Sequence, residues 1–236
     1  MAIQCSLINR GTYISIPQLT LAGVCTIVMW TKGTLTAEGL LGWGTNAQKI
    51  VRNTSNSIFC RPVDGDTSSF SHSGTWLSGW NMFVIKRDSS NVWYTSLNGS
   101  SFTTQSTISG NSIWDRLGWA ASQDNTRDPY CEYCFWDGAD LTEAEVSALW
   151  SGTKPNMIKT TSIARYYPLY KNVSTQPDLS GNAQNGSLVE QAGGDMSDAD
   201  HAFMKQYAPS PKYRPILVSG GGGGGTPRFF VPAIIG

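Results

Sequence analysis

The chain has 236 residues, and its 17 Lys and Arg are balanced by 17 Asp and Glu. Zero net charge argues against a nucleic-acid binder, which carries a basic stripe or patch, and against electrostatic attachment to an anionic membrane. Hydrophobic residues make up 40% of the chain, enough for a core. Charged residues make up only 14%, well below the roughly 25% of an average domain. This composition is typical of all-β proteins with many turns.

Neither a secretory signal nor a membrane span is recognised. The N-terminal sequence is MAIQCSLINRG, without a basic region followed by an apolar one. The longest internal apolar run is GVCTIVMW, which is too short to cross a bilayer. Five cysteines are an odd number, and without an export signal we expect free, mostly buried thiols in a reducing cytoplasm.

Strand-like segments recur at short spacing, with turn residues between them. The clearest pair is 82–86 and 92–97, which a polar turn joins, and Asn98-Gly99 then begins a second hairpin. Many short strands favour a sandwich or jelly roll over alternating βαβ units. We therefore predict an all-β sandwich of two antiparallel sheets.

One helix is predicted, in the sequence DGADLTEAEVSALWSGTKP. Thr142 is a suitable N-cap, and Glu145, three residues on, completes a capping box. Leu141 and Val146 occupy the positions of a hydrophobic staple. The apolar residues of the helix form one stripe, which we expect to face the sheets.

After Gly193 the strand pattern fades. Residues 196–207 are predicted to form a short helix capped by Ser197 or Asp198, and Pro and Gly then become frequent. The predicted organisation is a jelly-roll domain at 1–192, an extension at 193–219, and a glycine-rich tether with an apolar C-terminal arm at 220–236.

Three segments resemble concanavalin A-like, laminin-G-like jelly rolls. The first is WDGADLTEAEVSALWSG, which is similar to their strand end and short capped helix. The second is ARYYPLYKNVSTQPDLSGNAQNGSLV, which resembles their tyrosine-rich strand and the loop after it. The third is GWNMFVIKRDSSNVWYTSLNG, which resembles their Trp-led central hairpin. Together the three support the resemblance over residues 10–190.

The order of these segments departs from the usual one. The Asp-x-Ser-Gly-Asn stretch commonly lies near the N-terminus of such domains, whereas here it follows the helix. Termini that lie close together tolerate such a permutation. The resemblance implies a domain type that occurs in phage virion proteins, in secreted sugar-binding proteins and in glucanases.

Paired carboxylates would be needed for glycoside hydrolysis, at a separation of about 5 to 10 Å. Glucanases of this fold carry them on one face of a strand. Glu132 has Asp137 five residues on, and in a regular strand the two point to opposite faces. We therefore expect no enzymatic activity, and an endo-glucanase is the weakest alternative.

The sequence CEYC, with Cys131 and Cys134, has the spacing of a metal or redox site. A tetrahedral zinc site needs four ligands, and the other cysteines are distant in sequence. In a regular strand the two thiols face opposite sides. We therefore interpret them as strand thiols, one of them buried.

Calcium is the one cofactor that the resemblance suggests. Asp178, Ser180 and Asn182 present oxygen atoms on alternate residues, in a loop where related domains often hold Ca²⁺. Oxygen ligands suit Ca²⁺, but about six to eight are required. The favoured alternative is an Asx-type turn, in which Asp178 bonds its own loop backbone. We expect no cofactor, with a calcium site at these three residues as the open alternative.

Most of the nine Trp and nine Tyr are expected to fill the core. Trp43, between Gly42 and Gly44, is the best candidate for a loop residue that stacks against a sugar. Packing is nevertheless the favoured interpretation of Trp43.

The C-terminal sequence is SGGGGGGTPRFFVPAIIG. Its glycines, Gly220 to Gly225, behave as a flexible tether, and the apolar tip would promote aggregation if left in water. We expect the tip to be buried in a neighbouring subunit, on a larger assembly or on its own domain. The predicted partner-binding residues are Arg228, Phe229, Phe230, Val231, Pro232, Ile234 and Ile235.

These features favour a phage virion structural protein, in particular a capsid-decoration or head-surface protein assembled in the host cytoplasm. Its jelly roll would face outward, and its C-terminal arm would bind virion proteins or sister subunits of a homo-oligomer. The alternative is a glycan-binding module, either a tail or fibre adhesin or a secreted lectin, whose partner is a surface glycan. Neither a nucleic-acid partner nor membrane insertion is expected.

Overall fold

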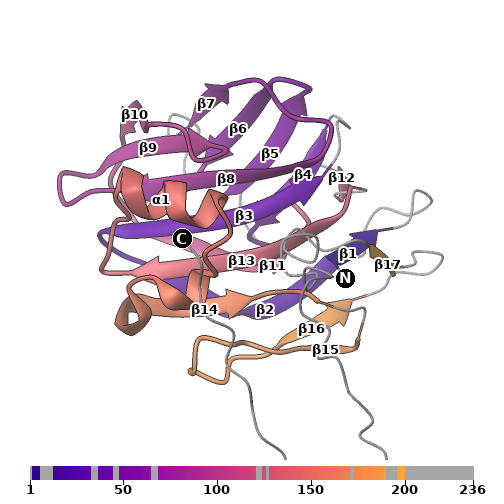
Figure 1. Ribbon diagram of the computed structural model, residues 1–236. Helices are drawn as coiled ribbons and strands as arrows, with labels where there is room; N and C mark the ends of the chain where they lie inside the picture. The colour runs from indigo at the N-terminus through magenta and orange to yellow at the C-terminus, as the bar shows by residue number, and fades with distance from the viewer. Residues whose placement is uncertain are drawn as a thin grey trace, which may run out of the picture. The chain divides into compact units, whose positions relative to one another are not determined.

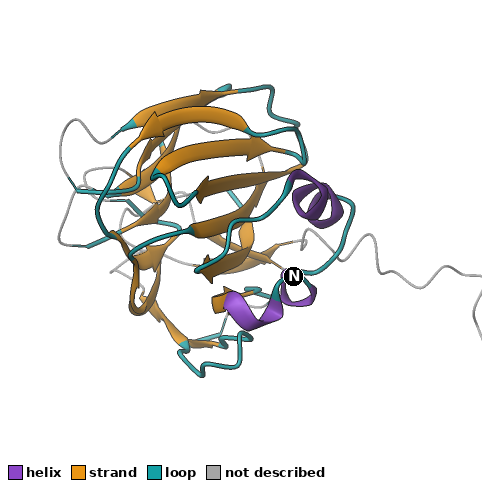
Figure 2. Cartoon of the chain, turned by 90° about the vertical axis from the view of Figure 1, so that its left-hand side faces the viewer, coloured by secondary structure: helices purple, strands orange, loops and turns teal. Residues whose placement is uncertain are grey.

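The computed structural model describes residues 2–5, 13–32, 37–44, 48–64, 69–120, 124–125, 128–170, 173–189 and 196–199. Within these ranges the chain forms two sheets, A and B, that pack face to face (Figure 1; Figure 2). All of them belong to one compact unit, Met1–Gln206. The predicted tether, Gly220 to Gly225, and the predicted arm residues Arg228 to Ile235 lie outside the described residues.

Sheet A has eight strands among the described residues, and neighbouring strands are antiparallel. Its order is β10 (Thr103–Thr107), β9 (Val92–Leu97), β8 (Trp80–Arg87), β3 (Cys25–Lys32), β13 (Tyr130–Asp137), β1 (Ala2–Cys5) and β17 (Met196–Ala199), and β14 (Ile163–Tyr167) also pairs with β13.

Sheet B has nine described strands. Its order is β15 (Thr175–Gln176), β16 (Gly186–Val189), β2 (Tyr13–Leu21), β11 (Ser112–Leu117), β4 (Glu38–Gly42), β5 (Lys49–Thr54), β6 (Ser57–Arg61) and β7 (Phe70–Ser73). The remaining strand, β12 (Asp124–Asn125), pairs with β4 in parallel, and the other pairs are antiparallel.

The predicted hairpins are confirmed. Strands β8 and β9 pair over five positions, from Phe83 opposite Leu97 to Arg87 opposite Trp93, and β10 returns along β9 after the Asn98-Gly99 turn. The core lies between the sheets, where apolar residues alternate along the strands. On β2, for example, Ile14 and Ile16 are buried while Tyr13 and Ser15 are partly exposed.

The predicted helix is α1 (Glu143–Trp150), and two short 3-10 turns, η1 (Pro155–Met157) and η2 (Thr160–Ser162), follow it. The capping box is present: the Thr142 hydroxyl accepts the Glu145 N–H at 3.3 Å, and the Glu145 carboxylate accepts the Thr142 N–H at 2.7 Å. Trp150 stacks on Trp30 of β3 with ring centres 5.3 Å apart. The helix therefore covers the outer face of sheet A (Figure 1).

The predicted helix at 196–207 is wrong where it can be compared with the structure. Residues 196–199 form β17, which pairs with β1 from Ala2 opposite Ala199 to Cys5 opposite Met196. Main-chain pairing with a strand far away in sequence outweighs the weak local preference for a helix cap. Sheet A thus includes residues beyond 192, and the rest of that segment lies outside the described residues.

Within the described residues, no helix is both long and apolar enough to span a bilayer.

Arg87, at the end of β8, is fully buried and bonds three main-chain carbonyls. Its guanidinium donates to the oxygens of Leu21 at 2.9 Å, Gly23 at 2.7 Å and Gly110 at 2.5 Å. Leu21 and Gly23 lie where the chain leaves sheet B for β3, and Gly110 lies where it leaves β10 for sheet B. One side chain therefore ties together two crossings between the sheets.

We predict that Arg87→Lys lowers the free energy of unfolding by about 3 kcal/mol, because a lysine cannot reach all three carbonyls and leaves buried acceptors unsatisfied. Urea unfolding measures this loss. Arg61→Lys, at a partly exposed position on β6, serves as the control and should change the free energy by less than about 0.5 kcal/mol. Equal effects of the two substitutions would contradict the role given to Arg87.

Candidate ligand-binding face

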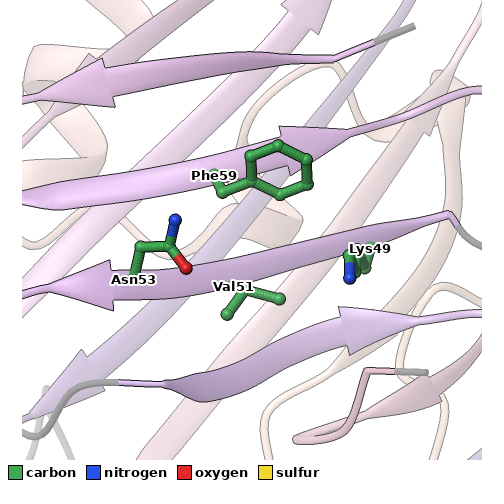
Figure 3. Close-up of a pocket in the computed structure, with 4 residues that line it drawn as sticks. All are labelled: Lys49, Val51, Asn53 and Phe59. Atoms are coloured by element: carbon green, nitrogen blue, oxygen red, sulfur yellow. The ribbon is translucent and has the colours of Figure 1, made fainter. Parts of the chain in front are cut away.

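The outer face of sheet B, which points away from the core, is a candidate binding face. On β5, Ile50 and Arg52 are fully buried, whereas the alternate residues Lys49, Val51 and Asn53 line a shallow hollow together with Phe59 of β6 (Figure 3). The volume of this hollow is about 180 Å³. Its lining therefore combines an ammonium group, an amide and an aromatic ring.

A second feature of this face is a cluster of two rings and a guanidinium, which we term the ring–cation platform: Tyr13, Arg116 and Trp119. The guanidinium carbon of Arg116 lies 4.7 Å from the ring centre of Tyr13 and 4.2 Å from that of Trp119. The two rings are 5.9 Å apart and tilted by 42°. All three residues are partly exposed. The platform therefore offers ring surface beside a cation.

The segment Gly42-Trp43-Gly44 at the end of β4 shapes the platform. A Cβ atom on Gly42 would lie 2.7 Å from the carbonyl oxygen of Trp119, so a larger residue would displace the main chain there. A Cβ atom on Gly44 would lie 2.1 Å from the Arg116 guanidinium, which is the flexible end of a side chain. Gly42 is therefore required where the Trp119 main chain approaches β4, whereas a side chain at Gly44 would shift only the Arg116 guanidinium.

Asp115 fixes the position of Gly44 relative to β11. Its carboxylate accepts the Gly44 N–H at 2.8 Å and lies 3.7 Å from the Arg116 Nε. Burial raises the pKa of Asp115 above its usual value, while the Gly44 hydrogen bond and the Arg116 charge oppose that rise. The acid therefore supports the turn and helps to orient the guanidinium.

Trp43, the predicted sugar-stacking residue, is partly buried in the same segment. Its main-chain N–H donates to the Gln48 carbonyl at 3.3 Å. The rings of the platform belong instead to Tyr13 and Trp119, which were missed at the sequence level. Trp119 follows Gly118 as Trp43 follows Gly42, so the same Gly-Trp pattern could have identified it. A sugar-stacking role for Trp43 stays a prediction.

The predicted calcium residues lie in a loop beside β14. One carboxylate oxygen of Asp178 accepts the N–H groups of Tyr166 and Ser180, both at 2.9 Å. The other accepts the Ser180 hydroxyl at 2.8 Å and the Gln184 N–H at 3.2 Å. These are the bonds that the Asx-turn alternative predicts, since Asp178 bonds its own loop backbone.

Asn182 continues this pattern along the edge of sheet A. Its amide nitrogen donates to the carbonyls of Ile163 at 3.1 Å and Ala164 at 3.0 Å, and the Leu179 N–H donates to the Tyr166 carbonyl at 2.8 Å. Edge strands expose unpaired main-chain groups. The loop therefore satisfies these groups on β14.

The two cysteines of CEYC lie on the same face of β13, which corrects the prediction that they face opposite sides. Cys131 is opposite Trp30 and Cys134 is opposite Val28, so three residues on β13 match two on β3. This is a β-bulge, which shifts the alternation by one residue, and Glu132 within it has a positive φ of 56°.

Both thiols are buried, not one as predicted. Burial, with a further contribution from Glu132, raises the pKa of Cys134 well above its ordinary value. The Glu132 carboxylate, itself buried, accepts a hydrogen bond from the Tyr166 hydroxyl at 2.5 Å. In the part of the chain that the structure describes, no three His, Cys, Asp or Glu side chains are grouped as metal ligands would be.

No protein-family model and no curated protein sequence matches this chain. Among solved structures it is similar to a heptameric SAP-like pentraxin from Limulus polyphemus, with 13% identity, a TM-score of 0.49, and coverage of 84% of this chain and 95% of the pentraxin. It is also similar to tailspike protein 2 of Escherichia coli O157:H7 bacteriophage CAB120, with 12% identity, a TM-score of 0.43, and coverage of 71% and 30%.

A third similar structure is that of domains LG4-5 of the mouse laminin α1 chain, with 10% identity, a TM-score of 0.37, and coverage of 55% of this chain and 42% of that one. The chain thus spans less than half the length of the tailspike and laminin structures. Among the described residues, two sheets that are antiparallel apart from the β4–β12 pair, together with one capped helix, confirm the predicted concanavalin A-like jelly-roll fold.

We predict that Asp178→Ala lowers the free energy of unfolding by about 2 kcal/mol, because the Tyr166 and Gln184 N–H groups lose their acceptor. We also predict that EDTA leaves the melting temperature of the unaltered protein unchanged. Asp137→Ala, at an exposed position on β13, is the matched control and should have little effect. A melting temperature that falls in EDTA and returns with CaCl₂ would instead establish the calcium alternative.

Proposed function

We propose that the chain is a non-enzymatic binding module that takes a glycan on the outer face of sheet B. The observation that carries this proposal is the ring–cation platform, where Arg116 lies against Tyr13 and Trp119. A sugar ring presents C–H groups that pack on an aromatic face and hydroxyls that bond to charged groups. Rigid rings with a polar group beside them supply both kinds of contact.

The absence of catalysis is part of the proposal. This part is supported by the positions of the Glu132 and Asp137 carboxylates. Glu132 is enclosed next to Tyr166, and Asp137 is exposed at the end of the same strand. A glycosidase needs two carboxylates that reach one bound sugar, and the platform lies on the other sheet.

The second part of the proposal is that the chain is a structural protein of a phage virion, and the C-terminal sequence supports it. Gly220 to Gly225 would give reach, and the apolar residues after them would bind a capsid protein or a sister subunit. The jelly roll would then be displayed on the particle, either as capsid decoration or as part of a tail or fibre. Assembly would take place in the host cytoplasm.

We predict that a glycan array detects ligands for the unaltered protein and that Trp119→Ala reduces their binding about fivefold to tenfold, because a stacked ring contributes about 1 to 1.4 kcal/mol to contacts of this kind. Gly44→Ala should have a similar effect without unfolding the chain, since its new methyl group displaces the Arg116 guanidinium.

Tyr94→Ala is the matched control. Tyr94 lies 5.4 Å from the Lys86 ammonium, but on sheet A, where Lys86 is held by the Asp140 carboxylate at 3.3 Å and the Leu141 carbonyl at 3.0 Å. Its loss should leave glycan binding intact. An array without ligands for a folded protein, or equal losses in Trp119→Ala and Tyr94→Ala, would refute the proposed binding face.

We predict that deletion of residues 220–236 leaves a folded jelly roll that no longer joins its particle or oligomer. Circular dichroism checks the fold, and light scattering after size-exclusion chromatography checks the assembly. Replacement of Phe229 and Phe230 by Ser, with the glycines kept, separates partner binding by the apolar arm from the length that the tether provides. Assembly that survives both changes would exclude the arm as the anchor.

A further inference from the structure

Two consecutive residues of opposite charge face outward together at the ring–cation platform. In a regular strand, consecutive side chains point to opposite faces of the sheet. The pairing of β11 with β2, however, shifts register between Trp114 and Arg116. Trp114 and Leu117 are fully buried, whereas the side chains of Asp115 and Arg116 between them are each 25% exposed. This irregularity therefore presents an acid and a base side by side, and such irregularities commonly re-aim side chains at functional sites.

The Asp115 carboxylate has one oxygen available to a ligand. Its Oδ1 accepts the Gly44 N–H at 2.8 Å and lies 3.7 Å from the Arg116 Nε. Its Oδ2 accepts no hydrogen bond from any other residue in the described part of the chain. An ionised carboxylate only accepts hydrogen bonds, so Oδ2 is suited to a donor such as a hydroxyl group.

The Arg116 guanidinium also has donors available. Its position is fixed by the rings of Tyr13 and Trp119, whose centres lie 4.7 Å and 4.2 Å from the guanidinium carbon. Its Nη2, Cζ and Nε are the atoms nearest to the Cβ position of Gly44, so Nη1 lies further from β4 than they do. Within the described residues, none of its N–H groups donates a hydrogen bond. The rings thus orient the guanidinium without occupying its donors.

A second ring–cation cluster, on the outer face of sheet A, differs in this respect. There the Lys86 ammonium lies 5.4 Å from the ring centre of Tyr94. This ammonium donates to the Asp140 carboxylate at 3.3 Å and to the Leu141 carbonyl at 3.0 Å. The Tyr94 hydroxyl donates to the Asp88 carboxylate at 3.0 Å. The polar groups of that cluster are therefore bonded within the protein, whereas the platform keeps a donor and an acceptor available.

We propose that Asp115 and Arg116 together bind two adjacent hydroxyl groups of a neutral sugar ring. The inference rests on the proposed function, since Tyr13 and Trp119 would hold that ring. One hydroxyl donates to the Asp115 Oδ2, and its neighbour accepts from the Arg116 Nη1, because a hydroxyl group is both a donor and an acceptor. Adjacent hydroxyls on a sugar ring are close enough to bond two side chains that are themselves within ion-pair distance.

The charges of this pair favour a neutral sugar over an acidic one. A carboxylate that approached the Arg116 guanidinium would also approach the Asp115 carboxylate, and like charges repel each other. A pair of hydroxyls avoids this repulsion and still gains hydrogen bonds to charged groups, which are stronger than those between neutral groups. The ligand class is therefore a neutral glycan whose units keep two adjacent hydroxyls free.

Isothermal titration calorimetry of the full-length protein tests this with four probes. Oligosaccharides of dextran, galactan and mannan are neutral and keep adjacent hydroxyls, whereas those of polygalacturonate add a carboxylate to each unit. We expect at least one neutral probe to bind about tenfold or more tightly than polygalacturonate, with an affinity that NaCl leaves unchanged. Methylation of that probe should weaken its binding about tenfold, because methyl ethers keep the ring but cannot donate to Asp115.

Two variants test the side chains. Asp115→Asn keeps an oxygen for the Gly44 N–H but replaces the other oxygen by an NH₂ donor, and Arg116→Met keeps a long side chain without donors. Each should reduce binding of the neutral probe about tenfold, with the fold checked by circular dichroism. Asp137→Asn and Lys32→Met remove the same charges from sheet A and are the matched controls, with no effect expected.

Polygalacturonate that binds as tightly as the neutral probes, or neutral probes that all fail to bind, would overturn this inference. So would a methylated probe that binds normally, and these comparisons need only the unaltered protein. The glycan array with Trp119→Ala decides the proposed function separately, because that substitution leaves Asp115 and Arg116 unchanged. Ligands lost in Trp119→Ala but bound normally by Asp115→Asn and Arg116→Met would uphold the binding face and refute the recognition of paired hydroxyls.

Discussion

The sandwich depends on the buried guanidinium of Arg87. The chain passes between the sheets after β2 and again after β10, and Arg87 bonds the carbonyls of Leu21, Gly23 and Gly110 at these two passages. A buried carbonyl without a donor costs about as much as a lost hydrogen bond, and the guanidinium has enough N–H donors, at Nε, Nη1 and Nη2, to serve both crossings. The charge lies over the Trp93 ring at 5.1 Å. Cys25, directly opposite, stays a thiol because burial raises its pKa to about 11 even though the Arg87 charge opposes that rise.

The two outer faces of the sandwich differ in what covers them. On sheet A, α1 packs through Trp150 against Trp30, and Lys86 is held by Asp140 and the Leu141 carbonyl. On sheet B the rings of the platform are partly exposed, and the hollow beside Lys49 is lined by strand residues of β5 and β6. Polar groups on the outer face of sheet A are thus used for packing, whereas the outer face of sheet B keeps ring surface partly exposed.

Local patterns predicted those parts of the structure that local chemistry decides. The capping box at Thr142 and the hairpin of β8 and β9 were predicted because their signals lie within a few residues. The bulge at Glu132 and the pairing of β17 with β1 depend on strands distant in sequence, and both were missed. The platform was missed for the same reason: Tyr13 and Trp119 are 106 positions apart and meet only when β2 and β11 pair. The prediction at Trp43 nevertheless lies in the correct segment. Its neighbours Gly42 and Gly44 allow the Trp119 main chain and the Arg116 guanidinium to approach β4 closely.

The outward positions of Lys49 and Arg61 on sheet B follow from strand register, and register is fixed from the inner face. A slip of one residue on β5 would turn Lys49 inward and Arg52 outward. Arg52 opposes such a slip, because its guanidinium is fully buried, pairs with the Asp128 carboxylate and lies over the Trp76 ring at 5.3 Å. Removing one partner of a buried ion pair costs several kcal/mol, far more than the repulsion between the partly exposed Lys49 and Arg61, which are opposite each other. The inward arginine thus keeps Lys49 opposite Gly42 and Arg61, so that packing in the core determines which charged residues face outward on sheet B.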